Sequence, residues 1–425
     1  MAPGPTRDAP RVLLVNSGKT EAVDRLRAVA PDAELDVITE AAYAVQYSAD
    51  VRLHFVTDIG DLSAVQRTAL ALQAAAPTDY VVAPSERSQQ AGGYLRSFLG
   101  LPGIPFDTAN LFSNKPVMKA ALAAQGIAVA PYRVVADLSA VPAAAAGVGW
   151  PVVVKPALGT GSMNTFAAPS PAAWAAIRDS AACDGLRHAN CPLVVERFVD
   201  MEGEYHCDGV VHNGRVEFAA ASRYFMPLLG NIDAFTGSYL LPDRHPDAQP
   251  IVALHERVVR ALGLRTGVTH LELFKTADGF LVGEIACRPA GGGIVEAIEM
   301  QYGVDLWRVF METALGRDPS VPAPVRRLRD DIIVNCDLPV RPGRVVRISG
   351  PDELARVPDV VRLSMTVGPG DVIGTRLHSA STTGLVYLAV ADEDLVHKRV
   401  QELAQAYVLD VEPTSACSGT PEWPD

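Results

Sequence analysis

Two glutamates, Glu272 and Glu284, lie in a stretch whose residue types suit the binding of a divalent cation. The stretch alternates apolar and polar residues around an Asp-Gly pair, which is typical of a β-hairpin turn. If residues 277–279 form a three-residue loop, the two glutamates face each other across the hairpin. Facing carboxylates destabilise a sheet, by about 4 kcal/mol at about 4 Å and an effective dielectric near 20. A cation between them reverses that sign. For an arbitrary pair on a hairpin, two solvated glutamates would be the preferred interpretation; the other residues of this chain favour a metal site.

Groups that bind anions follow the hairpin. Arg288 comes four residues after Glu284, and its planar guanidinium matches carboxylate and phosphate oxygens. Three consecutive glycines then open a helix, whose free N–H groups attract anions; they are Gly291, Gly292 and Gly293. His270 shares a sheet face with Glu272 and either orients a substrate, acts as a base or is structural.

Two lysines earlier in the chain could hold phosphate groups. Lys155 ends an apolar strand, which fixes its stem while the ammonium acts as a point charge. Lys115 lies in the first turn of an expected helix, whereas Lys119, on the same face, is interpreted as solvated. A loop of small residues after Lys155 lets backbone N–H groups approach phosphate oxygens. Its residues are Gly159, Thr160, Gly161 and Ser162.

A strand that becomes a hinge could recognise a nucleoside. Backbone groups near Val199 could read the edge of a base, and Glu196 lies at the end of the strand before it. Glu204 could accept hydrogen bonds from ribose hydroxyls, with Glu202 as a competitor for that role.

The elements that must position these residues follow two patterns. Residues 11–110 alternate short apolar strands with helices, which predicts a parallel, Rossmann-like sheet. Lys19 follows a Ser-Gly pair as in a phosphate-binding P-loop, but Leu13 stands where the first glycine is required, so that motif is excluded. Beyond residue 110 a mixed region alternates hairpins and helices, with an irregular segment at 222–248 that contains Arg223 and is a candidate substrate loop.

The expected division of the chain is therefore as follows: a disordered lead at 1–10, the Rossmann-like domain at 11–110, a catalytic domain at 111–329 with a lid at about 132–200, a C-terminal α+β subdomain at 330–412 and a disordered tail at 413–425. The fold class is α/β combined with α+β.

Composition narrows the function classes. The net charge of −12 gives the chain no overall nucleic-acid footprint. We find no apolar run of the roughly 18 residues that a membrane span needs. Six cysteines without CxxC or paired spacing indicate reduced thiols and a cytoplasmic location.

The order of these features is similar to that of the ATP-grasp superfamily, from about residue 110 to 315. The spacing His270-x-Glu272…Glu284-x-x-x-Arg288 resembles the carboxylate–amine ligases that join amino acids, such as bacterial dipeptide ligases and carnosine synthase. The resemblance implies the ATP-grasp fold, small-molecule carboxylate and amine substrates, and a homodimer. It also implies ATP with two Mg²⁺ ions, or Mn²⁺ in their place.

The same resemblance implies a role for each residue. Lys115 and Lys155 would contact ATP phosphates, and residues 159–162 would close over them. Glu196 and Val199 would meet adenine and Glu204 the ribose. Glu272 and Glu284 would hold the metal. The residues implied at the acyl phosphate or the substrates are Arg288, His270, Gly291, Gly292 and Arg223.

The implied reaction is the activation of a carboxylate as an acyl phosphate and its capture by an amine, with release of ADP and phosphate. One alternative keeps the fold but acts as a bicarbonate-dependent carboxylase or a purine-precursor ligase. Another is a non-catalytic nucleotide-binding module, suggested by Ala286 where many members have a metal-binding asparagine.

Overall fold

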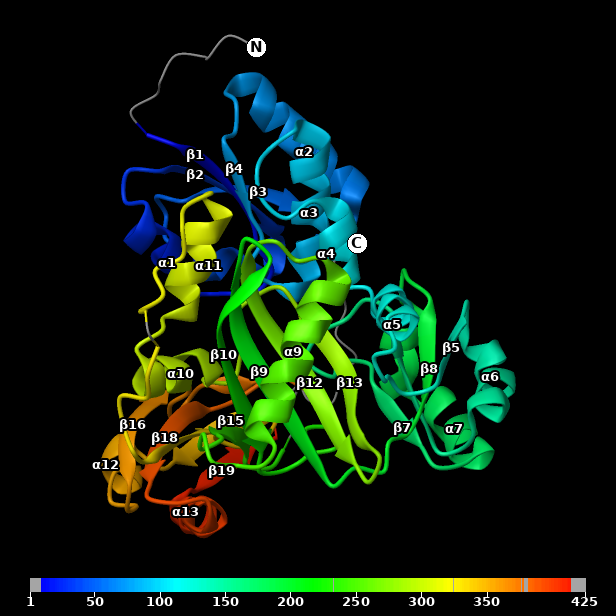
Figure 1. Cartoon of the computed structure of the whole chain (residues 1–425), viewed down its shortest axis with the longest axis vertical. Coiled ribbons are helices and arrows are strands. Elements are labelled where there is room, and N and C mark those ends of the chain that lie inside the picture. The colour runs from blue at the N-terminus through cyan, green and yellow to red at the C-terminus, as the bar shows by residue number, and fades with distance from the viewer. Residues whose placement is uncertain (1–8, 232, 324, 376, 378–380, 414–425) are drawn as a thin grey trace.

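The N-terminal domain is a parallel sheet flanked by helices, as the sequence predicts. The computed structural model describes residues 9–231, 233–323, 325–375, 377 and 381–413. Four parallel strands lie in the order β3-β2-β1-β4 (Figure 1). The elements are β1 (Arg11–Val15), α1 (Ala22–Val29), β2 (Glu34–Glu40), β3 (Arg52–Val56), α2 (Leu62–Ala75), β4 (Tyr80–Val82), α3 (Glu86–Leu99) and α4 (Phe106–Leu111).

A large antiparallel sheet forms the centre of the molecule. Within the described residues its strand order is β13-β12-β9-β10-β11-β14-β18-β16. Its strands and the helices that follow them are β9 (Gly203–His212), β10 (Arg215–Tyr224), β11 (Thr236–Leu240), α9 (Ala248–Leu262), β12 (Gly267–Thr276), β13 (Gly279–Ala286), α10 (Ile294–Tyr302), α11 (Leu306–Ala314) and β14 (Ile332–Asp337).

The segment at 222–248 is not irregular throughout, so that expectation is wrong in part. Strand β10 continues to Tyr224, and β11 pairs with β10 on one side and β14 on the other. The glycines of this segment suggest a loop, but Gly237 lies within strand β11. A Cβ at this position would lie 2.0 Å from the carbonyl oxygen of Asn335. A glycine inside a strand often marks such a close backbone approach.

The expected lid is a small antiparallel sheet beside the outer strand β13 (Figure 1). Its strands follow the order β5-β8-β6-β7. Helix α5 (Lys115–Ala124) lies between this sheet and the central one. The lid elements are β5 (Tyr132–Val135), α6 (Val141–Val148), β6 (Val152–Pro156), β7 (Phe166–Ala168), α7 (Pro171–Arg178), α8 (Asp184–Arg187) and β8 (Leu193–Arg197).

The C-terminal region shares the central sheet. Strands β14, β18 and β16 extend it across the boundary expected at residue 330, and β17, β15 and β19 form a separate small sheet. The elements after β14 are β15 (Gly343–Ile348), α12 (Pro351–Leu354), β16 (Val360–Met365), β17 (Val372–Ile373), β18 (Gly384–Val390), α13 (Asp394–Ala406) and β19 (Leu409–Glu412). The expected lead and tail fall almost entirely outside the described residues.

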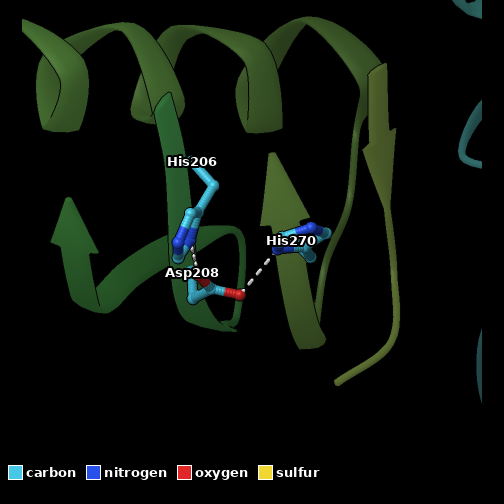
Figure 2. A group of neighbouring side chains, drawn as sticks. All are labelled: His206, Asp208 and His270. Atoms are coloured by element: carbon cyan, nitrogen blue, oxygen red, sulfur yellow. Dashed lines mark hydrogen bonds and ion pairs between the residues drawn. The ribbon is translucent and has the colours of Figure 1, made fainter. Parts of the chain in front are cut away.

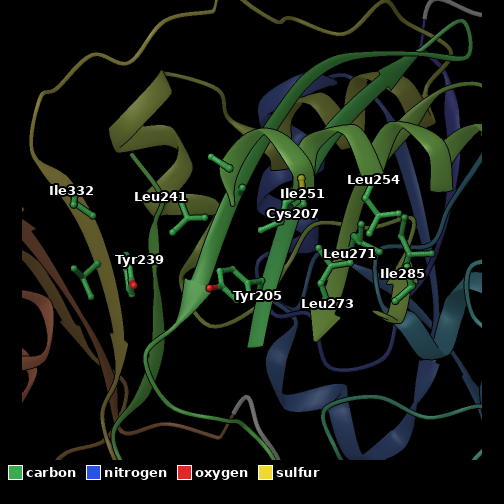
Figure 3. Packing of buried hydrophobic residues seen from close by; sticks show 14 of the residues in the cluster. Tyr205, Cys207, Tyr239, Leu241, Ile251, Leu254, Leu271, Leu273, Ile285 and Ile332 are labelled. Carbon is green, nitrogen blue, oxygen red and sulfur yellow. The ribbon is translucent and has the colours of Figure 1, made fainter. Parts of the chain in front are cut away.

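The two faces of the central sheet differ in chemistry. On one face, apolar side chains such as Leu271 and Ile285 pack beneath Ile251 and Leu254 of α9 (Figure 3). The other face is apolar under α10 and α11 and becomes polar toward the glutamate hairpin. Because side chains alternate along a strand, one sheet provides both the main core and the floor of a polar site. No helix among the described residues has the length and apolarity needed to cross a bilayer.

Candidate active site

The two glutamates of the hairpin face each other as predicted. Glu272 on β12 pairs in register with Glu284 on β13. The predicted three-residue loop is wrong, because Thr276 pairs directly with Gly279 and leaves a two-residue turn. Gly283 restores the glutamate pairing: it is the extra residue of a β-bulge, since Leu273 pairs with Val282.

A chain of opposite charges connects the hairpin to the N-terminal domain. The Nζ of Lys115 lies 3.3 Å from Glu284 Oε2 and 3.8 Å from Glu86 Oε1. Glu86, at the start of α3, accepts a 2.6 Å hydrogen bond from Arg288 Nη2. Burial would raise the pKa of Glu284, but Lys115 and Lys155 outweigh burial and lower it to about 2. Glu284 is therefore an anion at neutral pH, as a metal ligand must be.

Glu196 lies between two lysines. Its oxygens are 3.2 Å from Lys119 Nζ and 3.3 Å from Lys155 Nζ, and all three side chains are largely buried. Lys119 also donates to the carbonyl oxygen of Gly283. The interpretation of Lys119 as a solvated lysine is wrong, because its buried side chain lies between Glu196 of β8 and the carbonyl oxygen of Gly283 in β13. The ion pair with Glu196 therefore holds the ammonium group of Lys155 in place.

Glu204 lies on the same sheet face as Glu272. Strand β9 places Glu204 and His206 two residues apart on that face, opposite Phe274 and Glu272 of β12. Glu204 is buried and accepts a hydrogen bond from the backbone N–H of Leu228, whereas its expected competitor Glu202 is exposed. Burial, and next the charge of Glu272, raises the pKa of Glu204 to about 7.

This raised pKa makes stability depend on pH. Since the folded-state pKa of Glu204 exceeds its unfolded value, its contribution to stability is greatest below about pH 4.5 and is lost as pH rises toward 7. We expect Glu204→Gln to flatten the decline in unfolding free energy between those pH values, measured by urea denaturation without nucleotide. An unchanged slope in the variant would contradict this assignment.

His270 belongs to a buried cluster on the polar face. Its Nδ1 lies 2.9 Å from Asp208 Oδ1, and the second oxygen of Asp208 lies 2.6 Å from His206 Nδ1 (Figure 2). The other ring nitrogen of His270 is 3.5 Å from Glu272 Oε1. Burial would lower the pKa of His270, but Asp208 outweighs burial and raises it to about 10. Both ring nitrogens face carboxylates, so the arrangement orients Glu272.

The cluster continues toward the turn that contains Gly291, Gly292 and Gly293, called the glycine turn below. His206 Nε2 lies 2.8 Å from the hydroxyl of Ser238, which donates to Asn335 Oδ1. The amide nitrogen of Asn335 donates to the carbonyl oxygen of Gly292 at 2.7 Å. A continuous series of polar contacts thus links Glu272 to the turn after Arg288.

The two glycine-containing turns have the predicted positions. Gly159 receives a 2.8 Å hydrogen bond from Lys115 on its carbonyl oxygen, which ties the loop 159–162 to α5. Gly292 and Gly293 adopt φ values of 59° and 74°, where non-glycine residues are strained, and Gly293 precedes the first residue of α10.

Arg223 and Val199 lie outside this polar group. Arg223 projects from the α9 side of the sheet, 5.5 Å from the ring of Tyr205 and 3.9 Å from Glu393. Arg223 pairs with Tyr205, which pairs with Leu273, so the strand register places Arg223 on the other face of the sheet from Glu272. Arg223 is therefore not part of the site. Val199 is half-buried in the hinge after β8, with its side chain outside the ion-pair chain.

Sequence reasoning missed several residues of the site. Glu86 comes from the N-terminal domain, far from the hairpin in sequence. Its one sequence signal is its position at the start of a helix, directly after the capping residue Ser85. Asp208 was recognisable, because Glu204, His206 and Asp208 form a polar every-second-residue series in an otherwise apolar strand.

Comparisons with known proteins identify the family of this chain. The ATP-grasp domain family matches residues 120–302, and the family described as L-amino acid ligase C-terminal domain 2 matches residues 338–412. An L-arginine-specific L-amino acid ligase from Bacillus subtilis is 31% identical over 407 residues, which cover 94% of this chain and 97% of that protein.

Solved structures share the fold. An L-amino acid ligase from Bacillus licheniformis superposes with a TM-score of 0.75 at 17% identity, covering 96% of this chain and 100% of that one. A carboxyaminoimidazole ribonucleotide synthase from Aspergillus clavatus gives 0.67 at 16% identity, over 94% of this chain and 98% of that one. Because the sequence identities are low, both similarities show the fold alone. The chain belongs to the L-amino acid ligase family of ATP-grasp enzymes, ATP-dependent carbon–nitrogen ligases that form amide bonds between amino acids.

Proposed function

We propose that the polar face between β13, α5 and the glycine turn is the catalytic centre of this ligase. The observation that carries the proposal is the facing pair Glu272 and Glu284, joined through Lys115 and Glu86 to Arg288. These groups come from the N-terminal domain, α5 and the central sheet, and they supply alternating charges within ion-pair distance. Such a series suits a reaction in which negative charge develops on transferred phosphate and acyl oxygens.

The residues present fit a divalent cation at the hairpin. Glu272 and Glu284 offer carboxylate oxygens, the ligands that Mg²⁺ prefers, and each is held in place by a neighbour, His270 or Lys115. Ala286 supplies no oxygen ligand from its side chain. Mg²⁺, at two positions, would neutralise charge on the phosphates of ATP. Water or phosphate oxygens would complete its coordination.

ATP would lie between the lid and the central sheet. Lys115 and Lys155 are the cations for its phosphates, and the loop 159–162, tied to Lys115 through Gly159, would cover them. Glu204 and the hinge at Val199 would meet the nucleoside. Because Glu196 is bound by two lysines, its role is to hold Lys155 in place rather than to read adenine with its side chain.

The reaction then has two steps. An oxygen of the donor carboxylate attacks the γ-phosphorus, the bond to ADP breaks, and an acyl phosphate forms. The neutral amine of the acceptor attacks the acyl carbon, and phosphate leaves with the electron pair of the C–O bond and takes up the proton that the nitrogen loses. Arg288 stabilises the oxyanion, assisted by N–H groups of Gly291–Gly293. Asp208 fixes the ring of His270, and His270 in turn orients Glu272.

The test is phosphate release from Mg-ATP across pairwise mixtures of amino acids, with mass detection of the condensed product. We expect release that requires two amino acids and a product lighter by one water than their sum. Release with one amino acid alone and no condensed product would contradict the proposal. A panel of carboxylates and amines that are not amino acids would then reveal a different acceptor.

A further inference from the structure

Asp337 is a buried carboxylate that the reaction above does not use. It ends β14 on the same sheet face as Glu272, pairs in register with Thr236 and is 7% exposed. Among the residues that the structure describes, no hydrogen-bond partner reaches its Oδ1. Burial raises the pKa of Asp337 to about 7. A buried carboxylate without a partner costs free energy, and a ligand that supplies the missing charge would offset that cost.

The carboxylate lies against the glycine turn that follows Arg288. A Cβ on Gly292 would be 3.1 Å from Asp337 Oδ2, so only a glycine leaves this space open. Asn335, two residues earlier on β14, holds the carbonyl oxygen of Gly292 at 2.7 Å. Strand β14 therefore positions both the turn and the acid beside it.

Arg288 has a complementary unsatisfied group. Its Nε is buried and, in the described part of the chain, has no hydrogen-bond partner. A donor and an acceptor, both unsatisfied, thus lie at the two ends of the short segment from Arg288 to Gly292. An amino acid carries the matching pair, an anionic carboxyl or acyl phosphate group and a cationic nitrogen.

We propose that Asp337 is a specificity-determining residue that binds the cationic nitrogen of an amino-acid substrate whose acyl or carboxylate end is held near Arg288. The nitrogen is either the α-ammonium group or a basic group on the side chain. Both are hydrogen-bond donors with a positive charge, and a charge-assisted hydrogen bond to a buried carboxylate is strong and directional. The inference rests on the proposed function and adds to it a determinant of substrate choice.

The test compares wild type with Asp337→Asn, which keeps the shape and removes the charge. Phosphate release is measured with L-arginine or with L-citrulline, its neutral analogue, each paired with L-alanine, and with L-alanine alone. Amino-acid concentrations are varied at saturating Mg-ATP, and the Mg-ATP concentration is varied at saturating amino acids. We expect the KM for an amino acid to rise at least tenfold while the KM for ATP changes less than twofold. Loss confined to L-arginine would assign the side-chain cation, and equal loss with L-arginine, L-citrulline and L-alanine would assign the α-ammonium group.

Glu312→Gln is the matched control, because Glu312 is also a buried carboxylate but is bound by Arg308 and Ser320 away from the site. Unchanged KM values in Asp337→Asn, or an equal change for ATP and amino acids, would overturn the proposal. Thermal unfolding of both variants separates binding from folding, since removal of an unpaired buried charge leaves Asp337→Asn at least as stable as wild type. Wild-type turnover with these amino acids tests the proposed function independently.

Discussion

Glu284→Gln is expected to lower kcat roughly 10²–10³-fold, the magnitude typical of removing one group that stabilises transition-state charge. The substitution keeps the shape of the side chain but removes its negative charge. Glu284 forms an ion pair with Lys115 and faces Glu272 across the strand pair. The same change should raise the Mg²⁺ concentration needed for half-maximal activity. Steady-state kinetics over a Mg²⁺ titration measures both effects.

The matched control is Glu217→Gln, an exposed glutamate on β10. It should retain wild-type kcat and the wild-type Mg²⁺ dependence. If Glu284→Gln also keeps kcat within about threefold, the hairpin does not hold the catalytic metal, since even the loss of an outer-shell partner typically costs 10–100-fold.

Arg288→Met is expected to abolish measurable ligation and to destabilise the fold. Arg288 and Glu86 form a 2.6 Å ion pair, with side chains 12% and 8% exposed. Removing one member of a buried pair costs about 3–5 kcal/mol, because the remaining charge is left without its partner. Glu86 retains its ion pair with Lys115, at 3.8 Å, so the lower end of that range applies. Urea denaturation measures the loss.

A double substitution separates the two roles of Arg288. In Arg288→Met/Glu86→Gln the unpaired anion is removed, so most of the lost unfolding free energy should return. If Arg288 stabilises the oxyanion as proposed, activity should not return, because the double variant still lacks the guanidinium. Recovery of ligation in the double variant would show that Arg288 acts only by neutralising Glu86.

The hairpin illustrates how a correct pairing was predicted through an incorrect turn. Alternation placed Glu272 and Glu284 on one face, and their facing arrangement is confirmed. The loop was wrong because the extra residue lies in the strand, at Gly283, rather than in the turn. An extra residue in the turn and an extra residue in the strand each shift the register by one, and glycine is common in both places.

Contacts between distant segments could not be predicted. The sequence predicts a solvated Lys119, because a helical pattern reveals which residues share a face but not what packs against that face. The lid and β13 cover that face, and Glu196 supplies the opposite charge. Glu86 was missed for the same reason, since its partners Lys115 and Arg288 come from other domains. Local periodicity predicts the alternating strands and helices of the N-terminal domain, whereas the ATP-grasp fold is implied by the resemblance of the motifs.

The acyl-phosphate step is the central claim, and isotope transfer tests it most directly. A donor amino acid carrying ¹⁸O in both carboxylate oxygens is incubated with Mg-ATP and an acceptor, and the released phosphate is analysed by mass. The mechanism predicts one ¹⁸O atom in each phosphate and one in the amide product, because the attacking carboxylate oxygen leaves with phosphorus. Unlabelled phosphate alongside a condensed product would contradict phosphorylation of the carboxylate.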